Sequence, residues 1–132
     1  MGIKITRVAG TKLKAEIDGF ELISGQVDEK TLPEGPSPSR LMVASLGLCA
    51  GHYAAWYLKR HNIQDMGLTV DVDTQEARDP SRVARFNVNL NLKANLTEEE
   101  RVGLLASVSR CYVGNTLKGN PEINYDLNVT KL

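Results

Sequence analysis

The segment from Leu41 to Leu58 constrains the fold more than any other part of the sequence. It reads LMVASLGLCAGHYAAWYL and contains no Asp, Glu, Lys or Arg. Ser37 and Pro38 before it suit the N-cap and the first position of a helix, and Asn62 after it suits a helix end. The pattern predicts a helix from residue 38 to residues 59–61, about 33 Å long. A helix that is apolar on all sides must be buried in either lipid or protein.

Two environments for this helix compete. Its length is at the threshold for a membrane span, but Ser45, His52 and several Gly and Ala make it only weakly hydrophobic. A chain of 132 residues has few other apolar helical surfaces with which to surround it. We therefore expect a second copy to cover it, with two such helices packed at the centre of an intertwined dimer. Small residues recur every four positions along the helix, which would let another backbone approach closely; they are Gly47, Gly51 and Ala55.

The residues before this helix alternate with the period of strands. Residues 3–8 and 13–17 each carry an alternating apolar set. Asp18-Gly19 separates LKAEI from FELIS, and an Asp-Gly pair between alternating runs predicts a tight hairpin turn. Residues 25–37 contain Gly, Pro and mixed charge, which predicts a long loop of the kind that often has a function.

The residues after this helix predict two long strands and a second helix. Apolar residues in 68–72 and 86–92 alternate with polar ones, which is typical of strands with one wet face. Thr97 and Glu100 form a capping box that opens the second helix, and this helix is expected to reach Cys111. Its predicted inward residues are Val102, Leu105, Val108 and Ser109.

A last alternating strand is expected from Ile123 to Val129. Consecutive strands joined by short turns favour an α+β fold with antiparallel pairing over a doubly wound parallel sheet. The length of the chain, 132 residues, predicts a single domain that covers residues 1–132.

The charge balance excludes several classes of protein. Sixteen basic side chains match sixteen acidic ones. Proteins that bind nucleic acid through phosphate contacts, or membranes through a polybasic patch, normally carry a basic excess. We therefore expect neither nucleic acid nor a membrane as a partner. The first residues show no signal-peptide pattern, so a cytoplasmic location is expected.

The two cysteines are candidates for chemistry. Cys49 lies in the middle of the long helix and Cys111 at the end of the second one. His52 follows Cys49 by one helical turn, where an imidazole could hold a thiolate. Three interpretations are open: two buried packing residues, a reactive pair, or a zinc site formed by Cys49, His52 and Cys111. The last departs from the usual four ligands borne on loops.

These residues also resemble a known family. The segment from Gly35 to Cys49, which includes GPSPSRL and ASLGLC, is similar to the first cysteine region of the osmotically inducible protein C and organic hydroperoxide resistance (OsmC/Ohr) family. The segment from Cys111 to Leu117, CYVGNTL, is similar to its second cysteine region. The resemblance covers nearly the whole chain. It implies an intertwined α+β homodimer, with antiparallel sheets around two long central helices.

The resemblance implies a thiol peroxidase of the oxidative stress response. Cys49 would be the peroxidatic thiolate that attacks a small organic hydroperoxide and becomes a sulfenic acid. Cys111 would be the resolving thiol, and a lipoyl-type or other dithiol would reduce the resulting disulfide. No metal or organic cofactor is implied. An apolar pocket at the dimer interface would favour alkyl peroxides over hydrogen peroxide; the expected lining residues are Leu46, Leu48 and Tyr53.

The residues that would activate the thiolate match that family less closely. Its peroxidases carry an arginine in the loop before the long helix and a glutamate ten residues before the first cysteine. Ser39 occupies the second position here, and residues 25–37 contain no arginine. Candidates for activating the thiolate are His52, Arg40 and Arg110, and candidates for supporting residues are Glu34 and Ser39. The alternative function is a non-enzymatic dimer that binds a small apolar or thiol-reactive ligand or acts as a redox sensor.

Overall fold

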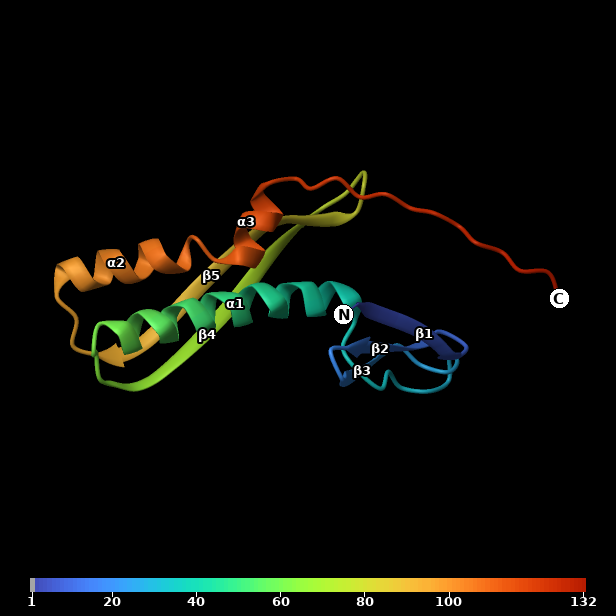
Figure 1. Ribbon diagram of the computed structural model, residues 1–132, viewed down its shortest axis with the longest axis horizontal. Helices are drawn as coiled ribbons and strands as arrows, with labels where there is room; N and C mark the ends of the chain where they lie inside the picture. The colour runs from blue at the N-terminus through green and yellow to red at the C-terminus, as the bar shows by residue number, and fades with distance from the viewer. Residues whose placement is uncertain (1) are drawn as a thin grey trace. The chain divides into compact units, whose positions relative to one another are not determined.

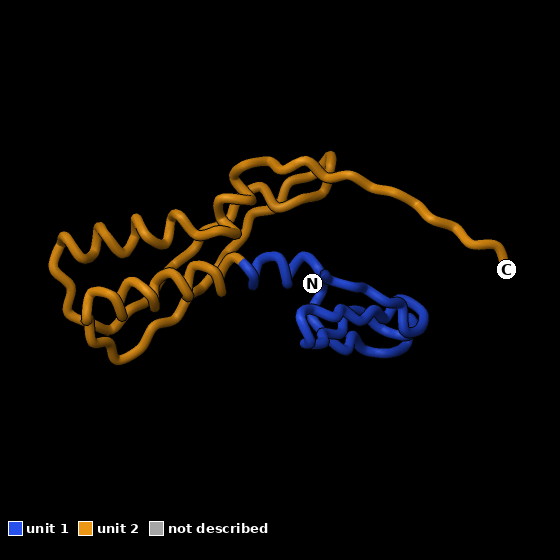
Figure 2. Tube along the Cα trace, viewed as in Figure 1, with its two compact units in different colours: residues 1–45 blue, residues 46–132 orange. Residues whose placement is uncertain are grey.

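The computed structural model describes residues 2–132, which form two compact units. Residues 1–45 make up the first unit and residues 46–132 the second (Figure 2). The long helix α1, Pro38–Arg60, begins in the first unit and continues into the second. Each unit is described below by itself.

The first unit is built on an antiparallel three-stranded sheet in the order β1-β2-β3. The strands are β1 (Ile3–Ala9), β2 (Lys12–Ile17) and β3 (Phe20–Ser24). Asp18 and Gly19 have φ angles of 50° and 90°. These are the positive values that a tight turn between paired strands requires. The predicted Asp-Gly hairpin is therefore confirmed.

The predicted loop before α1 is held against this sheet. Thr11 donates its hydroxyl to the carbonyl of Gln26 at 2.9 Å, and Ser24 donates its hydroxyl to the carbonyl of Pro36 at 2.8 Å. A side chain on Gly35 would overlap the backbone carbonyl of Ile23, so the close approach of loop and strand requires glycine there. The loop is thus a packed part of the first unit.

Helix α1 begins and ends where the sequence predicts. The Ser37 carbonyl accepts from the Leu41 N–H at 3.0 Å, and Ser37 Oγ lies 3.4 Å from the Arg40 nitrogen. The helix ends at Arg60, and Asn62 turns the chain with a φ of 52°. With a mean hydropathy of 1.3, α1 is long and apolar enough to cross a membrane. However, Ala50 and Ala54 are almost fully buried in the core, so α1 is a core helix.

The second unit places α1 and α2 (Glu98–Val108) along the long hairpin of β4 (Asp65–Ala77) and β5 (Arg82–Ala94), as Figure 1 shows. Its core combines side chains from α1 and α2 with apolar residues of the hairpin; the buried members are Ala50, Ala54, Tyr57, Leu104 and Val108. Alternating hairpin residues, such as Leu68, Val70, Val88, Leu90 and Leu92, pack against them. The predicted two-residue period of both strands is confirmed.

The small residues of α1 make room for this hairpin. A methyl group on Gly47 would lie 3.0 Å from Val72 Cγ2, and one on Gly51 would lie 3.6 Å from Val70 Cγ2. The sequence predicted that these positions admit another backbone. In this chain the side chains of β4 occupy the space, while Ala55 stays exposed.

The second helix begins as predicted but buries a different face. Its capping box is confirmed: Thr97 Oγ1 accepts from the Glu100 N–H at 3.1 Å, and Glu100 accepts from the Thr97 N–H at 2.9 Å. However, Val102 and Leu105 are 59% and 52% exposed and Ser109 is also exposed, so three of the four predicted inward residues are wrong. The buried face is Leu104, Ser107 and Val108, because glycine at the neighbouring position lets α2 approach Tyr57 of α1 closely.

The chain after α2 also departs from its prediction. The helix ends at Val108, and a separate short helix, α3 (Tyr112–Lys118), follows with Cys111 as its N-cap. Residues 120–132 are extended but form no strand within this chain. Their alternating apolar side chains are exposed, because no strand edge of the described chain pairs with them; the exposed residues are Ile123, Tyr125, Leu127 and Val129.

Candidate functional site

The second unit brings the two cysteines together. Cys49 lies on α1 and is half-buried, and Cys111 precedes α3 and is 3% exposed. Both are free thiols. The Cys49 side chain is near enough to Cys111 to raise the pKa of its thiol. Two thiols in this relation can be joined by a disulfide after one of them is oxidised.

The break between α2 and α3 positions Cys111. Ser109 caps the end of α2, and the chain turns so that Cys111 adopts extended backbone angles at the start of α3. Its Sγ accepts the backbone N–H of Gly114 at 3.3 Å. A methyl group on Gly114 would lie 3.0 Å from the same sulfur, so the absence of a side chain gives the thiol its space.

The groups around Cys111 shift the pKa of its thiol in opposite directions. Burial is the largest effect and raises the pKa of its thiol, because a thiolate is poorly solvated away from water. The Gly114 hydrogen bond lowers this pKa, the Cys49 side chain raises it, and the charge of Lys118 lowers it. The net shift is upward, so Cys111 is held as a thiol at neutral pH.

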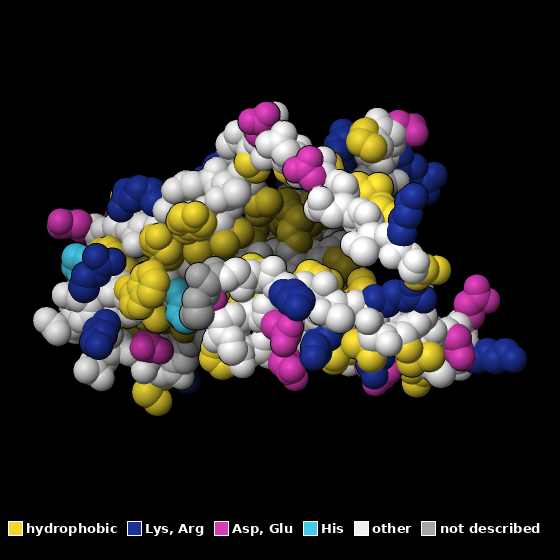
Figure 3. Space-filling view, turned by 45° about the vertical axis from the view of Figure 1, so that its right-hand side comes forward, with side chains coloured by type: hydrophobic (Ala, Val, Ile, Leu, Met, Phe, Trp, Pro, Cys, Tyr) yellow, Lys and Arg dark blue, Asp and Glu magenta, His cyan; other side chains and the backbone are white. Residues whose placement is uncertain are grey.

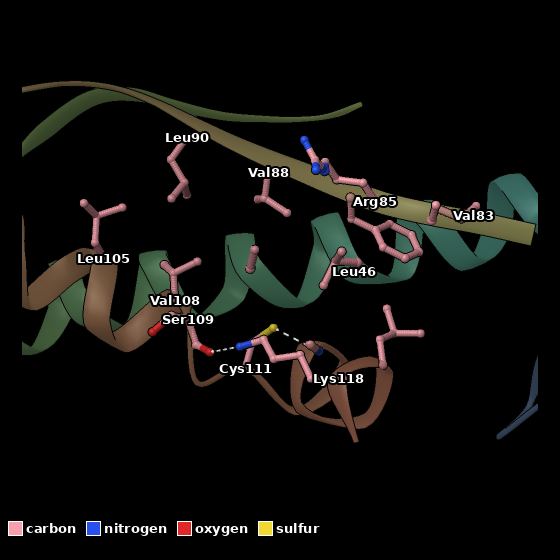
Figure 4. A pocket seen from close by; sticks show the side chains of 15 residues that line it. Leu46, Val83, Arg85, Val88, Leu90, Leu105, Val108, Ser109, Cys111 and Lys118 are labelled. Atoms are coloured by element: carbon pink, nitrogen blue, oxygen red, sulfur yellow. Dashed lines mark hydrogen bonds between the residues drawn. The ribbon is translucent and has the colours of Figure 1, made fainter. Parts of the chain in front are cut away.

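Lys118 is a site residue that the sequence analysis missed. It lies at the end of α3, and its Nζ donates to the backbone carbonyl of Ser109 at 3.0 Å. This hydrogen bond carries the ammonium group back toward Cys111 (Figure 4). If α3 had been predicted, Lys118 would have been expected at its end, within a short helix that begins at Cys111. The predicted second helix ended at Cys111, so nothing in the sequence singled out Lys118.

A cavity of about 520 Å³ opens beside Cys111 in the second unit. Its walls come from α1, β5, α2 and α3, and most lining side chains are apolar (Figure 4). They include Leu46, Ala50, Phe86, Val88, Leu90, Leu105, Val108 and Leu117. The space-filling view shows apolar side chains gathered on the visible face (Figure 3). The cavity can therefore hold a small apolar molecule next to a thiol.

The three expected pocket residues are separated in the structure. Leu46 lines the cavity beside Cys111. Leu48 is 65% exposed on another side of α1. Tyr53 packs against the core, and its ring lies 5.2 Å from that of Trp56.

The candidates for activating the thiolate are also separated from one another in the structure. The His52 ring stacks on Trp56 at a centroid distance of 5.7 Å. Arg110 is exposed next to Cys111, and its carbonyl accepts from the Asn115 side chain at 3.2 Å. In residues 2–132, no three His, Cys, Asp or Glu side chains are grouped as a metal site would require, so the zinc interpretation gains no support.

The remaining candidates lie in the first unit. Arg40 is exposed in the first turn of α1. Glu34 forms an ion pair with Lys12, with Oε1 and Nζ at 2.9 Å. Ser39 Oγ lies 3.4 Å from Ser37 Oγ at the start of the helix. Glu34 therefore has a basic partner, which is a lysine of β2.

A comparison with protein families gives one match over most of the chain. The model of a family described as OsmC-like protein matches residues 28–126. The matched range contains both cysteines, the residues that line the cavity and most of the loop before α1. A comparison with curated proteins gives no match.

Solved structures match the chain in fold. An OsmC-like protein from Mycoplasma pneumoniae superposes with a TM-score of 0.76 at 20% identity and covers 90% of this chain and 87% of its own. An OsmC-like hydroperoxide resistance protein from Jannaschia sp. has a TM-score of 0.62 at 18% identity, with coverage of 98% and 93%. The organic hydroperoxide resistance protein OhrB of Bacillus subtilis has a TM-score of 0.54 at 15% identity, with coverage of 90% for both chains. The predicted α+β fold with antiparallel sheets is confirmed.

Proposed function

Because the chain belongs to the OsmC-like protein family, we propose that it is a thiol peroxidase that reduces organic hydroperoxides to alcohols through Cys49 and Cys111. The observation that carries the proposal is the meeting of these two free thiols, of which Cys111 lines an apolar cavity. Two neighbours in fold are named as hydroperoxide resistance proteins, which supports the same chemistry and a role in the stress response.

The proposed reaction begins at Cys49. Its thiolate attacks one oxygen of the hydroperoxide, so an S–O bond forms, the O–O bond breaks, and the alkoxide takes a proton to leave as an alcohol. Cys49 is then a sulfenic acid. The Cys111 thiol gives up its proton and attacks Cys49 Sγ, an S–S bond forms, and the hydroxyl group takes a proton and leaves as water. The greater exposure of Cys49 supports its role as the cysteine that meets the peroxide first.

The cavity supports an apolar substrate. Its aliphatic and aromatic walls favour a peroxide with a hydrocarbon group, which loses contact with water on binding. Hydrogen peroxide has no such group and would gain nothing from these walls. Leu46 contributes to the wall next to Cys111, since its Cδ1 lies close to the backbone of Gly114.

The proposed working form is a homodimer in the cytoplasm. On α1, Leu48 and Trp56 are 65% and 50% exposed. In the first unit, Ile3 and Phe20 are 68% and 77% exposed. Together with residues 123–129, these side chains would leave large apolar areas in water, which favours their burial against a second copy.

The proposed reductant is a dithiol of the lipoyl type or another small dithiol. It would reduce the Cys49–Cys111 disulfide by two successive exchange steps and leave as its own disulfide. The chemistry needs neither a metal nor an organic cofactor, because both sulfur atoms come from the chain.

The test is turnover of cumene hydroperoxide with a dithiol, measured beside hydrogen peroxide at equal concentration. We expect faster consumption of the cumene compound and loss of activity in Cys49→Ser. Leu46→Ala should reduce the preference for the cumene compound several-fold, because it removes cavity wall. Leu48→Ala is the matched control, since Leu48 is exposed and its removal should leave the preference unchanged. Equal consumption of both peroxides by all variants would contradict the proposal.

A second candidate function is supported by the same cavity. A dimer without catalytic turnover could bind a small apolar or thiol-reactive ligand there, or use the two thiols as a redox sensor. The volume of about 520 Å³ favours such a ligand. This candidate predicts stoichiometric binding or a single oxidation, with no repeated consumption of peroxide when a dithiol is present.

A further inference from the structure

The surroundings of the two sulfur atoms differ in a way that matters when the disulfide is reduced. Thiol–disulfide exchange proceeds by attack of a thiolate on one sulfur while the other leaves as a thiolate. The rate depends on access to the attacked sulfur and on the stability of the leaving thiolate. The two sulfur atoms of a disulfide are therefore attacked at equal rates only when their surroundings are the same.

Access favours attack at Cys49. It is half-buried on α1, whereas Cys111 is 3% exposed and enclosed by the turn between α2 and α3. A dithiol approaching from solvent thus meets Cys49 Sγ before Cys111 Sγ. Attack at Cys49 also leaves the turn around Cys111 in place.

Burial disfavours a thiolate at Cys111, and two neighbouring groups offset part of this cost when Cys111 leaves. Its Sγ already accepts the Gly114 N–H at 3.3 Å, and this hydrogen bond is buried. Lys118 Nζ is held on the Ser109 carbonyl at 3.0 Å, and its charge acts on the Cys111 sulfur. Both donors lie beside the reduced Cys111 sulfur, where they can stabilise the charge that it carries after the S–S bond breaks.

We propose that the limited access to Cys111 directs the reducing dithiol to Cys49, and that Lys118 and the Gly114 N–H stabilise the Cys111 thiolate as it leaves. This inference rests on the proposed function, in which the Cys49–Cys111 disulfide forms in each cycle. In the first step, a thiolate of the reductant bonds to Cys49 Sγ and the S–S bond breaks with its electron pair on Cys111. In the second step, the other thiolate of the dithiol attacks the reductant sulfur that is bonded to Cys49. The bond between that sulfur and Cys49 Sγ breaks, and Cys49 is released as a thiolate. The disulfide gains two electrons and the dithiol becomes a cyclic disulfide.

The direction of attack is tested on protein oxidised with diamide, which forms the disulfide without any peroxidase activity. The oxidised chain is mixed briefly with glutathione, quenched with N-ethylmaleimide in denaturant, and mapped by peptide mass spectrometry. We expect glutathione on Cys49 and maleimide on Cys111. Glutathione on Cys111, or equal amounts on both cysteines, would overturn the inference even if peroxide turnover is normal.

The role of Lys118 is tested by the rate of reduction. Lys118→Met keeps a chain of similar length without charge and should slow reduction by dithiothreitol about three- to tenfold. The ultraviolet absorbance of the thiolate should also show a higher Cys111 pKa in the Cys49→Ser, Lys118→Met double variant than in Cys49→Ser. Lys118→Arg should restore the rate, and Lys93→Met is a matched control because Lys93 is an exposed residue of β5. Unchanged rates and pKa in Lys118→Met would contradict the role of Lys118.

Discussion

Cys111 Sγ accepts a hydrogen bond from the backbone N–H of Gly114 at 3.3 Å. The same glycine faces the sulfur from the first turn of α3, where a methyl group would lie 3.0 Å from Sγ and 3.7 Å from Leu46 Cδ1. Gly114 thus provides both a donor for the thiol and the space that the sulfur occupies. The reactivity of Cys111 should depend on this one residue more than on its charged neighbours in the sequence.

Gly114→Ala should slow formation of the Cys49–Cys111 disulfide several-fold. The added methyl group displaces Cys111 Sγ by a few tenths of an ångström, and overpacking of this kind costs about 1–3 kcal/mol of stability. The measurement is the loss of thiols with time after addition of diamide, together with urea unfolding. Gly2→Ala is the control, because nothing lies near its added methyl group. Equal rates in Gly114→Ala and the parent would contradict a tight site around the sulfur.

Stability should fall in alkaline solution because of Cys111. Burial raises the pKa of its thiol, so the unfolded chain loses this proton at a lower pH than the folded chain does. The stabilisation is complete below the ordinary thiol pKa of about 8.5 and is lost as the pH rises through the folded-state value. In urea unfolding of the reduced protein, the free energy of unfolding should decrease between about pH 7 and about pH 10, and the decrease should be smaller in Cys111→Ala. A parallel decrease in both proteins would refute this assignment.

Gly103→Ala should destabilise the contact between α1 and α2. A methyl group there would overlap the hydroxyl of Tyr57, and the expected loss is about 1–3 kcal/mol. Tyr57→Phe removes the overlapping oxygen, so the double variant should lose less than the sum of the two single variants. Urea unfolding of all four proteins measures this coupling. Additive losses would show that the hydroxyl does not limit the approach of the helices.

The proposed dimer predicts a mass of about twice the 14.5 kDa of one chain in light scattering. Trp56→Asp places a charge on the exposed face of α1 and should shift the mass toward that of a single chain. Lys30→Asp, in the loop of the first unit, is a control for the added acidic charge. A parent protein with the mass of one chain would contradict the dimer.

Local signals in the sequence predicted those parts of the fold that depend on local interactions. The Asp18-Gly19 turn and the capping box of Thr97 and Glu100 are formed by neighbours in the chain, and both are present. The uncharged run also predicted α1 with its correct ends. Each of these elements is specified by hydrogen bonds within a few residues.

Parts of the site depend on tertiary contacts that sequence patterns do not specify. Val102, Leu104, Leu105 and Val108 fit two possible inward faces of α2, and the approach of Gly103 to Tyr57 decides between them. The break between α2 and α3, which brings Lys118 toward Cys111, follows from packing rather than from a clear periodicity. The alternation in residues 123–129 predicts a strand but does not say which chain supplies its partner.

The central claim is that Cys49 and Cys111 act as one redox pair toward an organic hydroperoxide. The most direct test counts free thiols in denatured samples before and after one equivalent of cumene hydroperoxide, with a dimedone trap for sulfenic acid. The account predicts loss of both thiols in the parent, a trapped sulfenic acid at Cys49 in Cys111→Ser, and no consumption of Cys111 in Cys49→Ser. Two intact thiols in the parent after several minutes would contradict it.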